Sequence, residues 1–282
     1  MALTNMSEEP SHHTFFSSLD LQAFHFYESE VVYKPGDGDF PPTAVDDHLD
    51  VYVNGFHYTT LILNPAHLDE TITGLLLGDG IIKSPSEIVD IKVDPEGRKV
   101  EALTSGNPRL KKIYVEDCAS LATSGVIVNS NLRVSWDIIV GVYVDFNRRT
   151  ISVTRGLAMH TTGLYDLVNR KAVIAHDTSR HTSIAKLIGL ATKGSLDFKR
   201  SIAITTGRAS SDMVLKFANV RVPIVVSTRG PLYSGLTAAT LFKVTLVSYI
   251  RRGDRVRGLT ILTYPERIIG YKRREATLAE DR

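Results

Sequence analysis

Cysteine is almost absent from this sequence. Cys118 is the only one among 282 residues. A single thiol excludes an intramolecular disulfide and any zinc site that needs several cysteines. The same scarcity is typical of proteins kept in a reducing compartment, so we expect a cytoplasmic protein.

Long apolar runs and a strong excess of one charge are also absent. No uncharged apolar stretch approaches the roughly 18 residues of a membrane span. The N-terminal residues lack a basic region followed by an apolar one, so we expect neither a membrane partner nor a targeting segment. The 33 Lys and Arg residues nearly balance 31 Asp and Glu residues, for a net charge of +2. This balance argues against nucleic acid as a partner, and any site for an anion must therefore be local.

The composition is that of a folded protein, and the pattern along the chain suggests two parts. Hydrophobic residues make up 43% of the sequence, which is enough for an ordinary core. Residues 1–20 have no periodicity, and we expect them to be disordered. We expect residues 21–130 to form a smaller α+β domain with a mobile loop over 105–130. Residues 131–282 should form a larger α/β domain.

The first part contains recognisable turn and helix-start residues. The Asn54-Gly55 pair predicts a hairpin over residues 49–63, because these residues suit a tight turn between strands. A helix should follow, with Asn64 as its N-cap and Pro65 at its first position, ending at Gly78 or Gly80. Two further strands are predicted over 88–93 and 99–103.

After residue 130, short apolar strands alternate with helices. Strands are predicted over 151–153, 172–175, 201–205, 222–227 and 244–249. Helices are predicted from about Ser179, around Met213 to Phe217, and over 234–242. This alternation is typical of a parallel or mixed sheet with helices packed on both faces.

One polar run lies where a strand should give way to a helix. The run from Asp177 to His181 follows an apolar strand, and its first three residues are good N-caps. Ligands often bind at such junctions in α/β proteins. The alternative is a well-capped surface helix with a hydrogen-bonded histidine. His176 and His181 are spaced so that they could bind a metal, but they flank the predicted helix start and no third ligand is evident, so we expect no resident metal.

Three successive strands are followed by small, basic segments. In a parallel sheet these strand ends share one edge, so backbone N–H groups, hydroxyls and guanidinium groups would converge there. Glycine lets the backbone approach a phosphate, and arginine matches its oxygens. The three segments are Thr205-Thr206-Gly207-Arg208, Ser227-Thr228-Arg229-Gly230 and Tyr249-Ile250-Arg251-Arg252-Gly253. They predict a site for a phosphate-bearing ligand.

A series of short motifs runs through the chain in a fixed order. Val53-Asn54-Gly55 forms a turn, Pro65 starts a helix, and residues 77–82 read LGDGII. The central motif supplies His160, Asp177, Arg180, His181, Lys186 and Gly189. Later segments read TGRASSDM at 206–213 and LTYPERI at 262–268. Together they resemble the FdhD family, the formate dehydrogenase accessory sulfurtransferases, from about Leu49 to Ile268.

The resemblance implies a fold, partners and a cargo. It implies a cytidine-deaminase-like C-terminal sheet and a homodimer. Sulfur would come from a cysteine desulfurase and pass to bis-molybdopterin guanine dinucleotide, with Mo or W, for formate dehydrogenase or a related molybdoenzyme. This cofactor is a large anion with several phosphates. The resemblance and the basic segments together give the candidate cofactor-binding residues His160, Asp177, Arg180, His181, Thr206, Gly207, Arg208, Arg229, Tyr249, Ile250, Arg251, Arg252, Gly253 and Asp254.

The chain departs from the family pattern at its cysteines. The family carries sulfur on a mobile C-G-x-C-G loop, since a persulfide needs an accessible thiolate. If Thr123-Ser124-Gly125 is aligned with the T-S-G before that loop, Val126 and Asn129 occupy the cysteine positions. Alternatively, Cys118 is the surviving thiol and the candidate persulfide carrier. Either way, sulfur cannot pass between two cysteines of one chain. Elsewhere, His176 and Ser179 replace a Glu and a Gly of the family.

Two functional hypotheses remain open. The first is a cofactor-binding accessory protein that transfers sulfur through Cys118. The second is a cofactor- or nucleotide-binding chaperone or regulator that performs no covalent chemistry. A zinc nucleoside deaminase, which the implied fold suggests, needs more metal-binding cysteines than this chain has.

Overall fold

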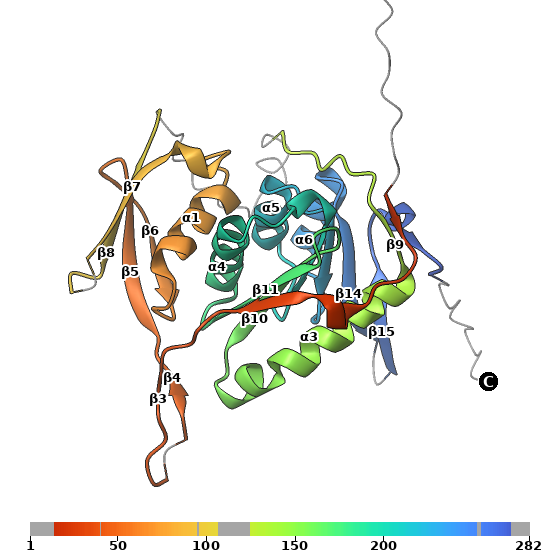
Figure 1. The fold of residues 1–282 in the computed structure, drawn as a ribbon, viewed down its shortest axis with the longest axis horizontal. Coiled ribbons are helices and arrows are strands. Elements are labelled where there is room, and N and C mark those ends of the chain that lie inside the picture. Colours follow the sequence, from red (N-terminus) through yellow and green to blue (C-terminus); the bar gives the residue numbers. More distant parts are fainter. Residues whose placement is uncertain (1–13, 40, 95, 107–124, 253–254, 272–282) are drawn as a thin grey trace, which may run out of the picture.

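The protein has a mixed α/β fold with several sheets. A computed structural model describes residues 14–39, 41–94, 96–106, 125–252 and 255–271. A sheet of seven strands occupies the centre, a four-stranded sheet lies at one end, and a small three-stranded sheet lies at the other (Figure 1). Within this part of the chain, no helix is long and apolar enough to span a membrane.

The central sheet is mixed, as predicted. Its strands, in spatial order, are β15 (Arg255–Ile261), β14 (Thr245–Arg252), β13 (Ile224–Ser227), β12 (Ser201–Thr205), β10 (His160–Asp166), β11 (Lys171–Asp177) and β2 (His25–Glu28). Strands β12, β13 and β14 are mutually parallel, and β10 pairs antiparallel with both β11 and β12. The parallel strands bring the ends of β12 and β13 to one edge.

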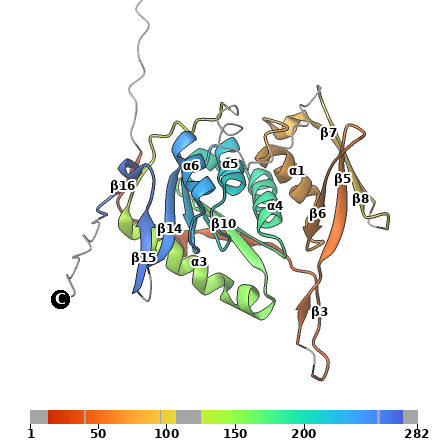
Figure 2. The same cartoon turned by 180° about the vertical axis from the view of Figure 1, so that it is seen from behind.

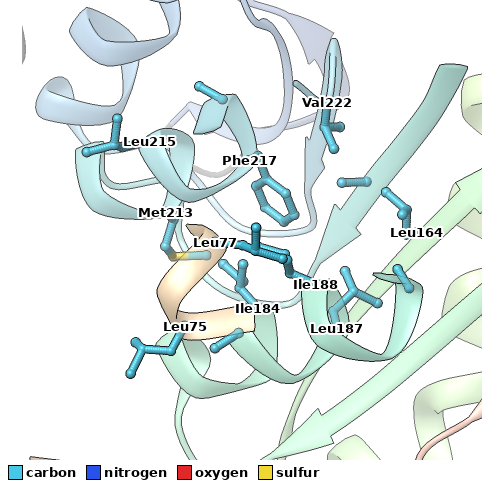
Figure 3. Packing of buried hydrophobic residues seen from close by; sticks show 14 of the residues in the cluster. Leu75, Leu77, Leu164, Ile184, Leu187, Ile188, Met213, Leu215, Phe217 and Val222 are labelled. Atoms are coloured by element: carbon cyan, nitrogen blue, oxygen red, sulfur yellow. The ribbon is translucent and has the colours of Figure 1, made fainter. Parts of the chain in front are cut away.

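Helices cover both faces of this sheet, as predicted. Successive residues of one strand point to opposite faces, so Ala203 joins one core while Ile202 and Ile204 join the other. The first core lies under α1 (Leu68–Gly78), α4 (Arg180–Lys193), α5 (Ser211–Asn219) and α6 (Tyr233–Leu241). Figure 3 shows Ile184, Leu187 and Phe217 packed within it. The second core lies under α3 (Trp136–Gly156), which runs along the other side of the sheet in Figure 2.

Helix α3 corrects the strand that the sequence predicts over Ile151–Val153. Its buried residues, which include Ile138, Val142, Phe146 and Thr150, recur every four residues, so a helix buries them on one side. Ile151 itself is exposed on this helix. The β-branched residues of 151–153 favour a strand locally, but the longer apolar periodicity decides the structure.

The N-terminal sheet confirms the predicted hairpin and the two strands after it. Its strands, in spatial order, are β6 (Phe56–Leu63), β5 (Asp47–Val53), β8 (Lys99–Thr104) and β7 (Ile88–Asp94). Asn54 and Gly55 have φ of 48° and 82°, as the tight turn between β5 and β6 requires. A separate ribbon pairs β3 (Tyr33–Lys34) with β4 (Thr43–Ala44).

Helix α1 begins three residues later than predicted. Its N-cap is His67, in a left-handed conformation, and its first residue is Leu68. Asn64 is fully buried instead, and its side-chain amide donates to the carbonyls of Val32 and Val45, both at 2.7 Å. Its side chain is therefore committed to the preceding segments rather than to capping the helix.

Two glycines allow α1 and α4 to cross in direct backbone contact. A Cβ atom added to Gly74 would lie 1.8 Å from the carbonyl oxygen of Ala185, and one added to Gly189 would lie 1.7 Å from that of Glu70. The crossing fixes the N-terminal half of the chain against the helix that begins at Arg180.

The small sheet joins three distant segments of the chain. Its strands are β1 (Phe15–Phe16), β9 (Arg133–Ser135) and β16 (Ile268–Ile269), and both outer strands run parallel to β9. Strand β1 lies within the segment 1–20 that we expect to be disordered, whereas residues 1–13 and most of the predicted loop 105–130 lie outside the described residues. The division into two domains and the likeness to cytidine deaminases stay predictions.

Candidate functional site

A buried ion pair marks the junction between β11 and α4. Nζ of Lys186 lies 2.7 Å from Oδ2 of Asp177, and both side chains are fully buried. Burial raises the pKa of Asp177 and lowers the pKa of Lys186, because each charge has lost its water, while their mutual attraction opposes both shifts. Lys186 also donates to the carbonyls of Asn64 and His176, both at 3.1 Å.

Asp177 organises the start of α4. Its Oδ1 accepts the backbone N–H of Ser179 at 3.1 Å and that of Asn64 at 3.3 Å. Ser179, in extended conformation, is the N-cap of the helix and is one of the three candidates that the sequence offers. Asp177 thus joins this helix start to the segment before α1. Direct contact between Asp177 and a ligand stays a prediction.

His176 is committed to the fold on both sides of its ring. Nδ1 lies 2.8 Å from Oγ1 of Thr161, and Nε2 lies 2.7 Å from Oε1 of Glu28. The bond to His176 lowers the pKa of the Glu28 carboxyl more than partial burial raises it. The pair ties the edge strand β2 to the sheet. Within the described ranges, no group of three or more His, Cys, Asp or Glu side chains is arranged to hold a metal.

A cluster of basic side chains lies where the start of β10, the β11–α4 junction and the end of β13 meet. His160 opens β10, Arg180 and His181 lie in the first turn of α4, and Arg229 follows β13. We call these four residues the cationic cluster. The pKa of His160 is lowered chiefly by burial, and further by the charges of Arg180, Arg229 and His181. Charged side chains from the β11–α4 junction and from the segment after β13 therefore act on the half-buried His160 ring.

The loop after β12 completes this site. Oγ1 of Thr206 accepts the backbone N–H of Thr161 at 2.9 Å and lies 3.5 Å from Nδ1 of His160. A Cβ atom added to Gly207 would lie 3.3 Å from that of Arg180 and 2.7 Å from Cε of Met213. Glycine therefore lets this loop approach the first residue of α4.

Hydroxyl groups hold the ends of β12 and β13 together. The backbone N–H of Thr228 donates to the carbonyl of Thr205 at 2.9 Å, and the Ser227 hydroxyl donates to the carbonyl of Gly207 at 2.8 Å. The Ser248 hydroxyl reaches the carbonyl of Arg229 at 2.5 Å. These bonds confirm that the first two basic segments share one edge, and they leave the loops fixed before any ligand arrives.

The third basic segment differs from the prediction. Tyr249 to Arg252 continue β14 as a strand, because this segment pairs with β15 in a hairpin instead of turning at the level where β13 ends. The Tyr249 ring stacks on Tyr143 of α3, with centroids 6.4 Å apart, and so faces the opposite side of the sheet from α4.

For the remaining predicted residues, the structure gives only the position in the chain or the strand, and their contact with a ligand stays a prediction. Arg208 is exposed, beside Gly207. Ile250 and Arg251 lie in β14 with Tyr249 and Arg252. Gly253, Asp254 and Cys118 lie outside the described residues. Of the predicted set, the structure brings together His160, Arg180, His181, Thr206, Gly207 and Arg229.

One residue of this site was not anticipated from the sequence. Oδ2 of Asp212, in the first turn of α5, lies 2.6 Å from Nδ1 of His181. The sequence does contain a signal for the position of Asp212. Helix α5 follows the basic segment 205–208, so its first turn must begin beside the same sheet edge.

Comparison with known proteins agrees with this architecture. The model of the FdhD/NarQ family matches residues 44–269, which is most of the chain. The chain belongs to the FdhD/NarQ family. The resemblance seen in its motifs is thereby confirmed. This FdhD/NarQ chain is 30% identical over 237 residues to the sulfur carrier protein FdhD of Methanothermobacter thermautotrophicus, covering 81% of this chain and 92% of that protein.

Further relatives of this FdhD/NarQ protein cover similar shares. The sulfur carrier protein FdhD of Geobacillus kaustophilus is 26% identical over 80% of this chain and 89% of its own length. A crystal structure of a candidate formate dehydrogenase accessory protein from Desulfotalea psychrophila matches with a TM-score of 0.65 and 26% identity. That match covers 86% of this chain and 97% of the other.

Proposed function

We propose that this FdhD/NarQ protein is an accessory protein for formate dehydrogenase that binds bis-molybdopterin guanine dinucleotide at the cationic cluster. The observation that carries the proposal is the half-buried His160 ring beside the charges of Arg180 and Arg229, with His181 next to Arg180 in the first turn of α4. The N-terminus of α4 adds its partial positive charge at the same place. Phosphates of the cofactor supply the complementary charge.

The cofactor is cargo in this proposal. A cysteine desulfurase delivers sulfur, formate dehydrogenase or a related molybdoenzyme receives the loaded cofactor, and the accessory protein acts as a homodimer. The names of the relatives, which are sulfur carrier proteins and an accessory protein of formate dehydrogenase, support this role.

Arg229→Glu will test the binding site. Guanosine diphosphate, which carries the guanine and both phosphates of the cofactor's nucleotide half, is titrated into the full-length protein by calorimetry. Replacing a cation that pairs with phosphate removes about 1.5–3 kcal/mol, so we expect affinity to fall about ten- to hundredfold. Arg155→Glu makes the same charge change at an exposed position of α3, across the sheet, and this variant should bind normally. Equal affinity in Arg229→Glu, Arg180→Glu and the wild type would remove the proposed site.

The sulfur step has one possible carrier. A persulfide on the desulfurase would transfer its outer sulfur to the Cys118 thiolate, which breaks the desulfurase S–S bond, forms a new one on Cys118 and releases the desulfurase thiolate. The second candidate function, a cofactor-binding chaperone without covalent chemistry, is favoured by the presence of only one cysteine.

Mass spectrometry will separate these two functions. After incubation with a cysteine desulfurase and cysteine, a carrier gains the mass of one sulfur atom at Cys118, and a reductant reverses the gain. Cys118→Ser is the matched control and gains nothing. If the wild type also gains nothing while it still binds guanosine diphosphate, the protein is a chaperone for the cofactor and not a sulfur carrier.

A further inference from the structure

The imidazole of His181 is held by a carboxylate on a neighbouring helix. Nδ1 of His181, in the first turn of α4, lies 2.6 Å from Oδ2 of Asp212, in the first turn of α5. Because an ionised carboxylate can only accept hydrogen bonds, Nδ1 must carry the proton between them. The other ring nitrogen, Nε2, is therefore the one left to meet a ligand. Within the described part of the chain, Nε2 makes no hydrogen bond.

The carboxylate of Asp212 is itself held by Lys216, on the side away from His181. Nζ of Lys216 lies 3.8 Å from its Oδ1, one helical turn further along α5. Lys216 is almost fully buried and forms an ion pair with Asp79 at the end of α1. Asp79 also accepts the Tyr58 hydroxyl at 2.8 Å. A chain of polar contacts thus runs from the sheet edge through two helices to β6.

The His181–Asp212 pair is more exposed than a structural tether requires. The two side chains retain 36% and 37% of their exposure, whereas Lys216 behind them retains 6%. Exposed ion pairs add little to stability, because water competes for both partners. The pair lies instead beside Arg180, at the edge where the charges of Arg180 and Arg229 act on the His160 ring. A histidine whose second nitrogen is held by a carboxylate is a common arrangement for controlling a proton.

We propose that Asp212 is a positioning residue that holds the Nδ1–H of His181, so that Nε2 faces a phosphate-bearing ligand and the ring takes up a proton when that ligand binds. This inference rests on the proposed function, since it assumes that phosphates enter the cationic cluster. It adds Asp212 to that site, together with a proton that His181 takes up on binding.

The proton follows from the direction of the hydrogen bonds. With Nδ1–H donated to Asp212, the neutral ring offers only a lone pair at Nε2, and a phosphate oxygen is an acceptor as well. Contact therefore requires a proton on Nε2. Arg180, Arg229, Lys216 and a protonated His160 oppose the resulting positive charge, whereas Asp212 and the phosphate favour it.

Nitrogen NMR on the free protein tests the positioning. Full-length protein labelled with ¹⁵N should show neutral His181 in the Nδ1–H tautomer. In Asp212→Asn, the side-chain amide can turn its NH₂ group toward Nδ1, so we expect a shift toward the Nε2–H tautomer. Asp212→Glu keeps the carboxylate and should keep the Nδ1–H form. A wild-type ring in the Nε2–H tautomer would overturn the inference, whatever the protein binds.

Calorimetry with guanosine diphosphate tests the proton. Titrations in buffers with different ionisation enthalpies report how many protons are taken up on binding. We expect uptake in the wild type, in Asp212→Glu and in His160→Gln, which removes the other histidine of the site. The Asp212→Asn variant should take up much less of a proton, because the His181 ring in this variant already carries a proton on Nε2. Its affinity should fall about tenfold through loss of the imidazolium charge.

The outcomes distinguish this inference from the proposed function. If the wild type binds guanosine diphosphate with the same proton uptake as Asp212→Asn, the binding site stands and the role of Asp212 is wrong. If uptake disappears in His160→Gln, the proton belongs to His160, and the inference is also wrong. If the wild type does not bind at all, the proposed function fails together with the phosphate contact of His181.

Discussion

Gly189→Ala will destabilise the protein by about 3 kcal/mol or more, even though alanine is the better helix former. The added methyl group would lie 1.7 Å from the carbonyl oxygen of Glu70, and a backbone atom cannot move aside as a flexible side chain can. Helix α4 would have to separate from α1. Because Arg180 and His181 lie on α4, phosphate binding should weaken as well. Urea unfolding, followed by circular dichroism, measures the loss.

A second helical glycine provides the matched control. A Cβ atom on Gly141, within α3, would meet only the Leu21 side chain at 3.6 Å, which is an ordinary contact. Gly141→Ala should therefore leave stability unchanged or raise it by up to about 1 kcal/mol. Equal stability changes in Gly141→Ala and Gly189→Ala would show that the crossing of α1 and α4 is not as close as described.

Removing one charge of the buried Lys186–Asp177 pair is expected to be as damaging. Lys186→Met leaves Asp177 without its cation in a site closed to water, and breaking such a pair costs about 3–5 kcal/mol. The carbonyls of Asn64 and His176 lose their donor at the same time. The free energy of unfolding, obtained from urea titrations near neutral pH, gives the size of the effect.

The double variant shows how much of this loss comes from the unpaired charge. Asp177→Asn in the Lys186→Met background removes the stranded carboxylate but retains an oxygen that can accept the N–H groups of Ser179 and Asn64. We expect the double variant to be more stable than Lys186→Met alone, with a coupling energy of about 1–3 kcal/mol. Strictly additive losses would mean that the two charges do not depend on each other.

Sequence reasoning found the elements whose residues act locally. The Asn54-Gly55 hairpin and the alternation of strands and helices over residues 172–249 depend on neighbours in the chain, and the structure confirms both, although β10 was not predicted. The errors arose where distant contacts decide. Asn64 has every property of an N-cap, yet its amide is occupied by Val32 and Val45. Ile151 lies at the end of a helix whose apolar period is visible only over fifteen residues or so.

The site was predictable to the extent that parallel strands share an edge. That rule brought Thr206 and Arg229 together correctly. It failed for Tyr249, because β14 continues past the edge to pair with β15, and the direction of its ring then depends on a strand that comes later. Asp212 was missed because its partner His181 is 31 residues away on another helix. No local sequence pattern around either residue predicts this contact.

The small sheet of β1, β9 and β16 has a consequence for synthesis on the ribosome. Its first strand, Phe15–Phe16, emerges early, but its last, Ile268–Ile269, follows roughly 250 residues later. At about 5–20 residues per second, the first segment waits on the order of tens of seconds for the sheet to be completed. Such distant pairings also close slowly. The small sheet therefore stays incomplete until residue 269 has been made.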